Sequence, residues 1–156
     1  MNGLERVQDA DKRFLIFGCL FLLSNKLQTI GNEFLGELTT KQWFLLLTMT
    51  NLCEQPPTIG ELAGLMGCSH QNTMQIARKL QEKGFLRITK DLKDQRALRV
   101  QSTDRWRQYC NERREQDDRF VDTLFDVLDE TELDVMRRCV LKLYDNLSDE
   151  GRFFHE

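Results

Sequence analysis

The stretch TIGELAGLMGCSHQNTMQIARKLQEKG, residues 58–84, decides the fold of this chain because it encodes two helices joined by a sharp turn. Thr58 and Glu61 have the spacing of a capping box, which predicts that a short helix begins directly after Thr58. Gly67 adopts the left-handed backbone conformation at little cost, so we expect it to end that helix. Ser69 is a favourable N-cap for a second helix, which fills the rest of the stretch.

An alternating pattern after the second helix predicts a β-hairpin. Apolar and polar residues alternate over residues 86–89 and again over residues 98–101, which is the period of strands with one buried face. The polar loop KDLKDQR, residues 90–96, joins the two runs. Two helices followed by a hairpin, with polar side chains on the outer face of the second helix, give the order of a winged helix-turn-helix.

The composition of the whole chain favours helices outside this region as well. The chain has 156 residues, of which 40% are hydrophobic and 30% charged, a balance that allows a packed core. Two prolines and nine glycines are too few for a turn-dense sandwich or barrel. Further capping pairs occur at Thr39 and Gln42 and at Asp129 and Glu132. We therefore expect a mainly α chain with a small β-hairpin wing and a helical dimerisation region.

The first predicted helix, from about Asp9 to Glu37, is apolar on several faces. Its stretch FLIFGCLFLL, Phe14–Leu23, resembles the core of a signal peptide, but the charges before it balance and no cleavage site follows. Ten residues are also fewer than the roughly 20 that span a bilayer. We interpret the segment as a buried helix of a protein without membrane contact. Because one small domain rarely covers several faces of a helix, we expect a second copy of the chain as partner.

Positive charge is concentrated in one part of the chain. Residues 69–107 contain ten Lys and Arg against four Asp and Glu, a net charge of +6, whereas the rest of the chain carries −9. On charge alone, an ordinary solvated surface and an anion-binding patch are equally good interpretations. The basic part coincides with the second helix and the hairpin, where a DNA-binding protein neutralises phosphates.

Several short motifs, in this order and spacing, resemble the MarR family of bacterial transcriptional regulators. They are LTTKQW (Leu38–Trp43), TIGELAGLMGCSHQN (Thr58–Asn72), LQEKGFL (Leu80–Leu86) and the wing signature Asp94-Gln95-Arg96. The sequence departs from the family pattern at Gln75, where many members carry arginine, and at QSTDRW (Gln101–Trp106). The resemblance implies a homodimer whose recognition helices enter the major groove and whose wings reach the adjacent minor groove. It divides the chain into an N-terminal dimerisation helix (1–38), a winged helix-turn-helix DNA-binding domain (39–102) and C-terminal dimerisation helices (103–156).

The candidate DNA contacts lie in the second helix and in the wing. The first turn of that helix has free N–H groups and short polar side chains that suit phosphates and base edges, although Ser69 equally suits a pure capping role. Arg96 at the wing tip suits a narrow minor groove, and Asp94 is expected to orient that guanidinium, to bind amides of the loop, or to stiffen the hairpin through a salt bridge. The full set is Ser69, His70, Gln71, Asn72, Thr73, Gln75, Arg78, Lys79, Lys93, Asp94 and Arg96.

The remaining reactive residues do not predict an enzyme. The five cysteines are odd in number and have no CxxC pair, which indicates a reducing cytoplasm. Cys68 precedes a helix N-terminus and is a candidate for redox sensing, against a default role as a buried structural cysteine. The only histidines are His70 and His155, and no glycine-rich phosphate loop is present. We therefore predict no catalytic site, no metal and no cofactor.

These features together predict a sequence-specific transcriptional regulator that binds double-stranded DNA. We expect a cytoplasmic homodimer on a pseudo-palindromic operator, acting as a repressor that a small-molecule effector or an oxidant releases. The alternative is a winged-helix module for protein–protein assembly without DNA binding. Such a module is expected to expose apolar anchors on the helix instead of His, Gln, Asn, Thr and Arg.

Overall fold

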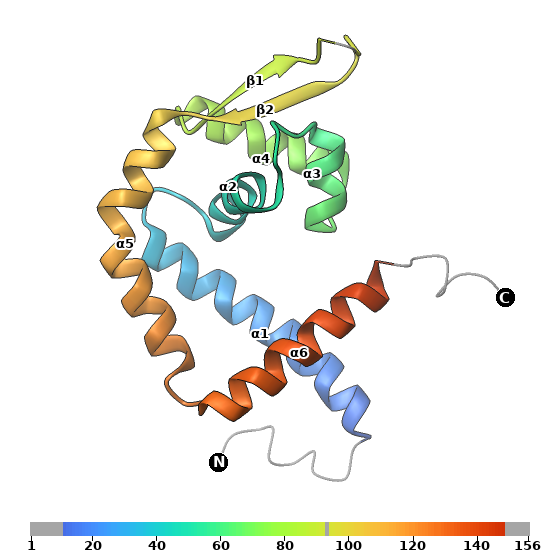
Figure 1. Cartoon of the computed structure of the whole chain (residues 1–156), viewed down its shortest axis with the longest axis vertical. Coiled ribbons are helices and arrows are strands. Elements are labelled where there is room, and N and C mark those ends of the chain that lie inside the picture. Colours follow the sequence, from blue (N-terminus) through green and yellow to red (C-terminus); the bar gives the residue numbers. More distant parts are fainter. Residues whose placement is uncertain (1–10, 93, 149–156) are drawn as a thin grey trace, which may run out of the picture. The chain divides into compact units, whose positions relative to one another are not determined.

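The computed structural model describes residues 11–92 and 94–148, and it divides into two compact units that meet between Tyr109 and Cys110. The described residues form six helices and one two-stranded antiparallel sheet (Figure 1). The predicted fold class, mainly α with a β-hairpin wing, is therefore confirmed. The elements are α1 (Lys12–Leu35), α2 (Thr40–Leu52), α3 (Ile59–Met66), α4 (His70–Glu82), β1 (Leu86–Lys90), β2 (Leu98–Ser102), α5 (Asp104–Phe125) and α6 (Glu130–Leu147).

The helix boundaries follow the predicted capping residues. At the start of α3, Glu61 N donates to Thr58 Oγ1 over 3.1 Å, and Thr58 N donates to Glu61 Oε2 over 2.6 Å. Equivalent capping boxes start α2 and α6. Gly67 ends α3 with a φ of 60°, in the left-handed region that glycine adopts without a Cβ penalty. Each box satisfies N–H groups that the first turn of a helix otherwise leaves unpaired.

The core of the first unit lies between α2, α3, α4 and the hairpin. Its largest fully buried side chains are Leu38, Leu45, Leu46, Ile59, Leu62, Leu80, Phe85, Leu86 and Val100. The first turns of α5 close this core, since the ring of Phe85 meets that of Tyr109 edge to face at 5.4 Å. Tyr109 Oη also donates to the carbonyl of Leu35 over 3.1 Å, which ties the end of α1 to the start of α5.

The hairpin is attached to the helix-turn-helix by backbone hydrogen bonds. β1 and β2 pair in the register Leu86↔Ser102 to Lys90↔Leu98. On the far side of β2, Val100 N donates to the carbonyl of Pro57 over 2.9 Å. The segment before α3 thus pairs with β2 in the manner of a third strand. This pairing places the wing in a fixed position relative to α3 and α4.

The first helix forms as predicted, but it is not buried within the single chain. Phe14, Phe17 and Phe21 are 77%, 62% and 61% exposed. Only the C-terminal end of α1 packs closely, where Thr40 Oγ1 donates to the carbonyl of Gln28 over 3.0 Å. With 24 residues, α1 is also long and apolar enough to cross a membrane by length and composition alone. Within the single chain α2 packs against one end of α1 only, so the burial of this helix against a second copy of the chain stays a prediction.

Two leucines of the short helix α3 test whether its buried face stabilises the winged unit. Replacing either leucine by alanine removes the same atoms from the same helix. The two sites differ in burial, since Leu62 is fully buried and Leu65 is 36% exposed. We expect Leu62→Ala to lower the free energy of unfolding by about 2–5 kcal/mol. Leu65→Ala should cost about 0.5 kcal/mol, as surface substitutions do. Urea unfolding followed by circular dichroism measures both values, and equal losses would contradict the observed core.

Candidate nucleic-acid interface

Helix α4 presents a polar face because most of its apolar residues turn toward the core. Thr73, Ile76, Ala77 and Leu80 are its buried residues. On the opposite side, Gln71, Gln75 and Arg78 follow one another at steps of four and three, so they share one exposed face. Two amides and a guanidinium in line form a surface that offers hydrogen bonds and no apolar anchor.

The N-terminus of α4 lies at one end of this polar face. Ser69 is the N-cap, and its Oγ accepts a hydrogen bond from Asn72 N over 3.2 Å. Ser69 and His70 are both exposed, whereas Asn72 is half-buried. The N–H groups of the first turn and the positive end of the helix dipole make this end of α4 suitable for an anion such as phosphate.

Most of the predicted contact residues are exposed; the exceptions are Asn72, which is half-buried, and Thr73, and one further residue lies outside the described ranges. The exposed ones are Ser69, His70, Gln71, Gln75, Arg78, Lys79, Asp94 and Arg96. The prediction of an exposed Thr73 is wrong: its side chain is fully buried, and its Oγ1 donates to the carbonyl of Ser69 over 3.1 Å. The buried stripe of α4 contains Ile76, Ala77 and Leu80 together with Thr73, whereas Met74 is only half-buried. Lys93 lies outside the described residues.

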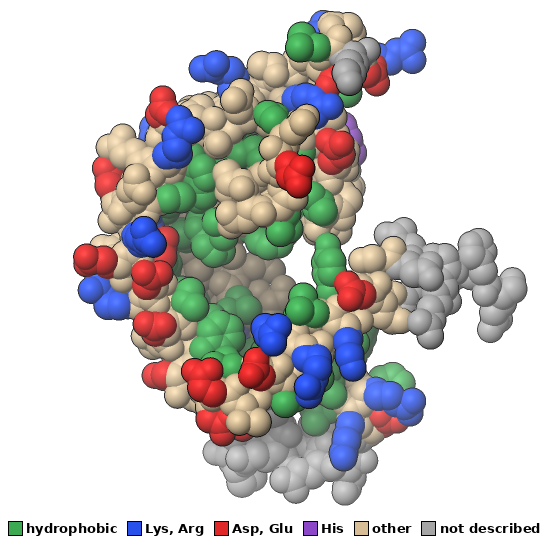
Figure 2. All heavy atoms as spheres, viewed as in Figure 1, with side chains coloured by type: hydrophobic (Ala, Val, Ile, Leu, Met, Phe, Trp, Pro, Cys, Tyr) green, Lys and Arg blue, Asp and Glu red, His purple; other side chains and the backbone are tan. Residues whose placement is uncertain are grey.

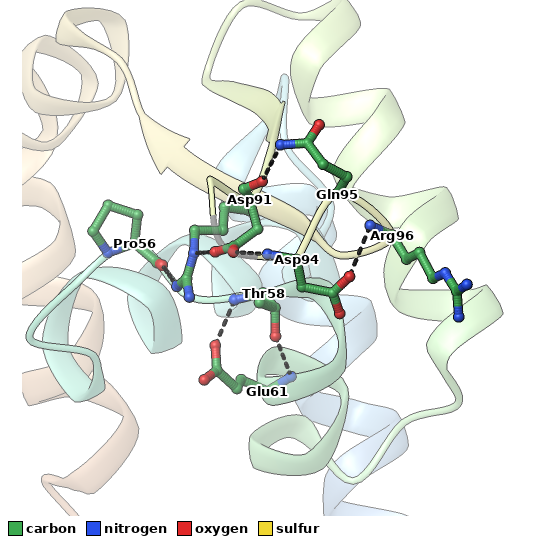
Figure 3. A network of polar contacts seen from close by, with 8 residues as sticks. Pro56, Thr58, Glu61, Asp91, Asp94, Gln95 and Arg96 are labelled. Carbon is green, nitrogen blue, oxygen red and sulfur yellow. Dashed lines mark hydrogen bonds and ion pairs between the residues drawn. The ribbon is translucent and has the colours of Figure 1, made fainter.

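A buried carboxylate organises the loop of the wing (Figure 3). Asp91 is only 5% exposed and forms an ion pair with Arg99 of β2. Its Oδ1 also accepts a hydrogen bond from Asp94 N over 2.7 Å, and its carbonyl accepts one from Gln95 Nε2 over 3.0 Å. Arg99 in turn donates from Nη1 to the carbonyl of Pro56 over 2.6 Å. One carboxylate therefore connects the wing loop, strand β2 and the segment before α3.

The tip of the wing exposes an arginine whose backbone is fixed. Asp94 Oδ1 accepts a hydrogen bond from Arg96 N over 2.9 Å. Of the roles predicted for Asp94, binding the amides of its own loop is the one the structure contains. The side chain of Arg96 points away from the network (Figure 3), and Lys and Arg side chains surround the hairpin at the top of Figure 2. The guanidinium is thus presented to solvent from a loop that the Asp91 network holds.

Two further groups beside the wing show shifted pKa values. The backbone and side-chain hydrogen bonds with Thr58 lower the pKa of Glu61, so this carboxylate stays charged and keeps its capping role. Burial, and secondarily the charge of Glu61, raises the pKa of the Cys53 thiol. Cys53 lines an open groove together with Glu54, Pro57, Leu65 and Arg99. A thiol with a raised pKa is a poor nucleophile at neutral pH.

The predicted redox candidate lies on the turn between α3 and α4. Cys68 is half-buried, and its Sγ donates to the carbonyl of Met66 over 3.5 Å. Its backbone N–H donates to the carbonyl of Ala63 as part of the turn. No group of three or more His, Cys, Asp or Glu that could hold a metal ion occurs within residues 11–92 and 94–148.

Asp91 and Arg99 are the site residues that the sequence analysis did not single out. The alternation of β2 placed Arg99 on the outer, polar face, and Asp91 stood among charged residues of a loop. The segment before α3 in fact pairs with the edge of β2 and accepts a hydrogen bond from Arg99, and this contact between residues 43 positions apart left no periodic signal. The recurrence of aspartate at Asp91 and Asp94 was the one local sign of a hydrogen-bonded loop.

A capped polar helix beside a hairpin with a basic tip defines a winged helix-turn-helix. Residues 38–98 match the sequence model of the MarR family. The winged region of this chain therefore matches the MarR family model, and the resemblance of its motifs is confirmed over these residues. No curated protein matches the sequence.

Several solved structures have the same fold over most of the chain. A crystal structure of MarR is 22% identical, with a TM-score of 0.71 over 85% of this chain and 96% of that one. The complex of MepR from S. aureus with DNA is 18% identical, with a TM-score of 0.72 over 83% of this chain and 97% of that one. PcaV from Streptomyces coelicolor, with its natural ligand, is 17% identical, with a TM-score of 0.65 over 79% and 89%.

The buried ion pair of the wing predicts a specific loss of stability. In Asp91→Asn the side chain keeps its size but no longer neutralises Arg99, so we expect the free energy of unfolding to fall by about 1–3 kcal/mol. The matched control is Asp104→Asn, whose side chain is 92% exposed and pairs with Arg107 on the surface. That control should change stability by less than about 1 kcal/mol. Equal losses in urea unfolding would show that the Asp91 network does not hold the wing.

Proposed function

We propose that this chain is a transcriptional regulator that binds double-stranded DNA in a sequence-specific manner. The observation that carries the proposal is the combination of the exposed face of α4 with the Arg96 tip of a wing attached to the same unit. The hydrogen bond from Val100 N to the carbonyl of Pro57 supports a fixed spacing between these two surfaces. The complex of MepR with DNA, which shares the fold, supports a nucleic-acid partner.

In the proposed complex, α4 lies in the major groove and supplies the base contacts. Gln71 and Gln75 are exposed on one face, and a glutamine amide can pair with the N6 and N7 edge of adenine. Arg78 and Lys79 follow farther along the helix and contact phosphates, which fixes the register without specifying sequence. Ser69, His70 and Asn72 lie at the helix N-terminus, which receives a further phosphate.

The wing supplies the second contact. Arg96 enters the adjacent minor groove, where the negative potential is strongest over A·T-rich sequence. Asp94 positions the Arg96 backbone, as its 2.9 Å hydrogen bond from Arg96 N indicates. Lys93 is retained as a candidate phosphate contact on the basis of the sequence alone.

The active form in this proposal is a homodimer assembled from residues 1–38 and 103–156, with residues 39–102 as the DNA-binding domain. Helix α6 has no buried residue in the single chain, and its stripe of Met136, Val140, Leu143 and Leu147 is exposed. Helix α1 exposes phenylalanines along its first half. Two copies that cover these faces would bring two α4 helices to half-sites about one turn of DNA apart, which requires a pseudo-palindromic operator.

The proposed regulator acts in the cytoplasm as a repressor that a small molecule or an oxidant releases. The ligand bound to PcaV, a protein of the same fold, supports a small-molecule effector. Cys68 is the proposed oxidant-sensitive residue. No catalytic step and no cofactor is part of the proposal.

The decisive test is whether the purified chain distinguishes DNA sequences. Duplexes selected from a random pool, and unrelated duplexes as competitors, are titrated by fluorescence anisotropy at several salt concentrations under reducing conditions. We expect binding that resists the competitor and weakens steeply with salt, because phosphate contacts release counterions. Weak and equal binding to all duplexes would contradict the proposal and favour a winged-helix module for protein assembly.

The arginine at the wing tip should contribute directly to affinity. We expect Arg96→Ala to weaken binding to the selected duplex by about 1–3 kcal/mol, since one charged minor-groove contact is lost. The matched control is Arg114→Ala in the polar middle of α5, an equal change of charge at an exposed site of the other unit. Unchanged affinity of Arg96→Ala in the same titration would remove Arg96 from the interface.

The exposed stripe of α6 should mediate dimerisation. We expect Leu143→Glu to convert the dimer to a monomer, because a buried and unpaired carboxylate costs several kcal/mol. Arg138→Glu, on the opposite face of the same helix, is the control and should leave the dimer intact. Light scattering coupled to size-exclusion chromatography gives both masses, and a dimeric Leu143→Glu protein would place the interface elsewhere.

A further inference from the structure

The loop of the wing exposes a leucine at the place that approaches DNA in the proposed function. Leu92 is 95% exposed, the highest value among the large hydrophobic side chains of the described residues. The other described residues of the loop are all polar up to Arg96. The remaining strongly exposed apolar side chains lie on helices or on the turn between α5 and α6, so Leu92 is separate from any of the faces that dimerisation would cover.

The exposure of Leu92 follows from the way its neighbour is held. Asp91 N donates to the carbonyl of Ala97 over 2.9 Å, and the Asp91 carbonyl accepts from Gln95 Nε2 over 3.0 Å. The carboxylate of Asp91 is at the same time bound to Asp94 N and to Arg99. With both backbone groups and the side chain of residue 91 held inside the hairpin, the next side chain is directed outward.

We propose that Leu92 is an apolar wedge that the wing inserts into the minor groove beside Arg96. The inference rests on the proposed function, because it needs the wing to lie against DNA. The guanidinium brings the loop to the negative potential of the groove, and the leucine then contacts sugars and base edges from which water is expelled. Apolar side chains of minor-groove proteins are known to enter between base steps and partly unstack them.

This wedge adds sequence preference at a position that α4 does not touch. Unstacking is easiest at pyrimidine–purine steps such as TA and CA, so the step below Leu92 is selected for deformability instead of for hydrogen bonds. The ion pair of Asp91 with Arg99 keeps the loop rigid, so that insertion of Leu92 deforms the DNA step and not the loop. Leu92 is thus a specificity-determining residue, and Asp91 is the positioning residue behind it.

The test compares Leu92→Ala with the conservative Leu92→Met and with Leu52→Ala. Leu52 is 66% exposed at the end of α2 and provides a matched loss of an exposed leucine outside the wing. The full chain is titrated with the selected duplex carrying 2-aminopurine at the step below the wing, and the bend is followed by energy transfer between labelled ends. Parallel titrations replace a TA step at that position by AA.

We expect Leu92→Ala to bind about tenfold more weakly, because the burial of a leucine side chain is lost. It should also lose the rise in 2-aminopurine fluorescence and the preference for TA over AA. Leu92→Met should retain both, and Leu52→Ala should behave as the unaltered chain. The wedge would be overturned if Leu92→Ala left affinity, fluorescence and step preference unchanged although Arg96→Ala weakened binding. Failure of the unaltered chain to distinguish duplexes would overturn the proposed function itself.

Discussion

The ion pair between Asp91 and Arg99 is the contact on which the geometry of the candidate interface depends. Asp91 is buried among loop atoms, and a buried carboxylate is tolerated only when a cation and hydrogen-bond donors surround it. Arg99 supplies the cation and donates at the same time to the carbonyl of Pro56, in the segment before α3. The same ion pair therefore fixes the conformation of the wing loop and attaches the wing to the helix-turn-helix.

Much of the fold was predictable because its determinants are local. A capping box needs only two residues three positions apart, and Thr58 with Glu61 forms the box that the spacing predicts. The left-handed backbone of Gly67 and the period-two burial of Leu86 and Val100 likewise depend on the residue and its immediate neighbours. Features of this kind are encoded within one or two turns of chain.

The features that the sequence did not predict depend on contacts between distant segments. The rotation of α4 that buries Thr73 is set by packing against α2, α3 and β1, and a shift of one residue in the buried stripe decides whether a side chain faces solvent or the core. The apolar faces of α1 indicate from the sequence that a partner surface is needed, but periodicity describes a face without naming the residues that cover it. The alternation places Arg99 on the outward side of β2, yet its side chain binds the carbonyl of Pro56 in a segment far away in the sequence.

The candidate site combines a fixed part, the wing loop held by Asp91, with an adaptable part, the glutamine side chains on α4. The amides of Gln71 and Gln75 carry no charge and can rotate to suit a base edge, which makes the α4 face tolerant of small changes in position. Attraction to DNA must then come from the surrounding cations, and the sequence concentrates these in residues 69–107 while the rest of the chain carries −9. In the proposed function, such an asymmetric field repels DNA from the acidic surfaces and favours encounters through the wing and α4. The proposed complex is thereby oriented by long-range charge before any base is contacted, and the Asp91 network holds the wing loop in one conformation during the approach.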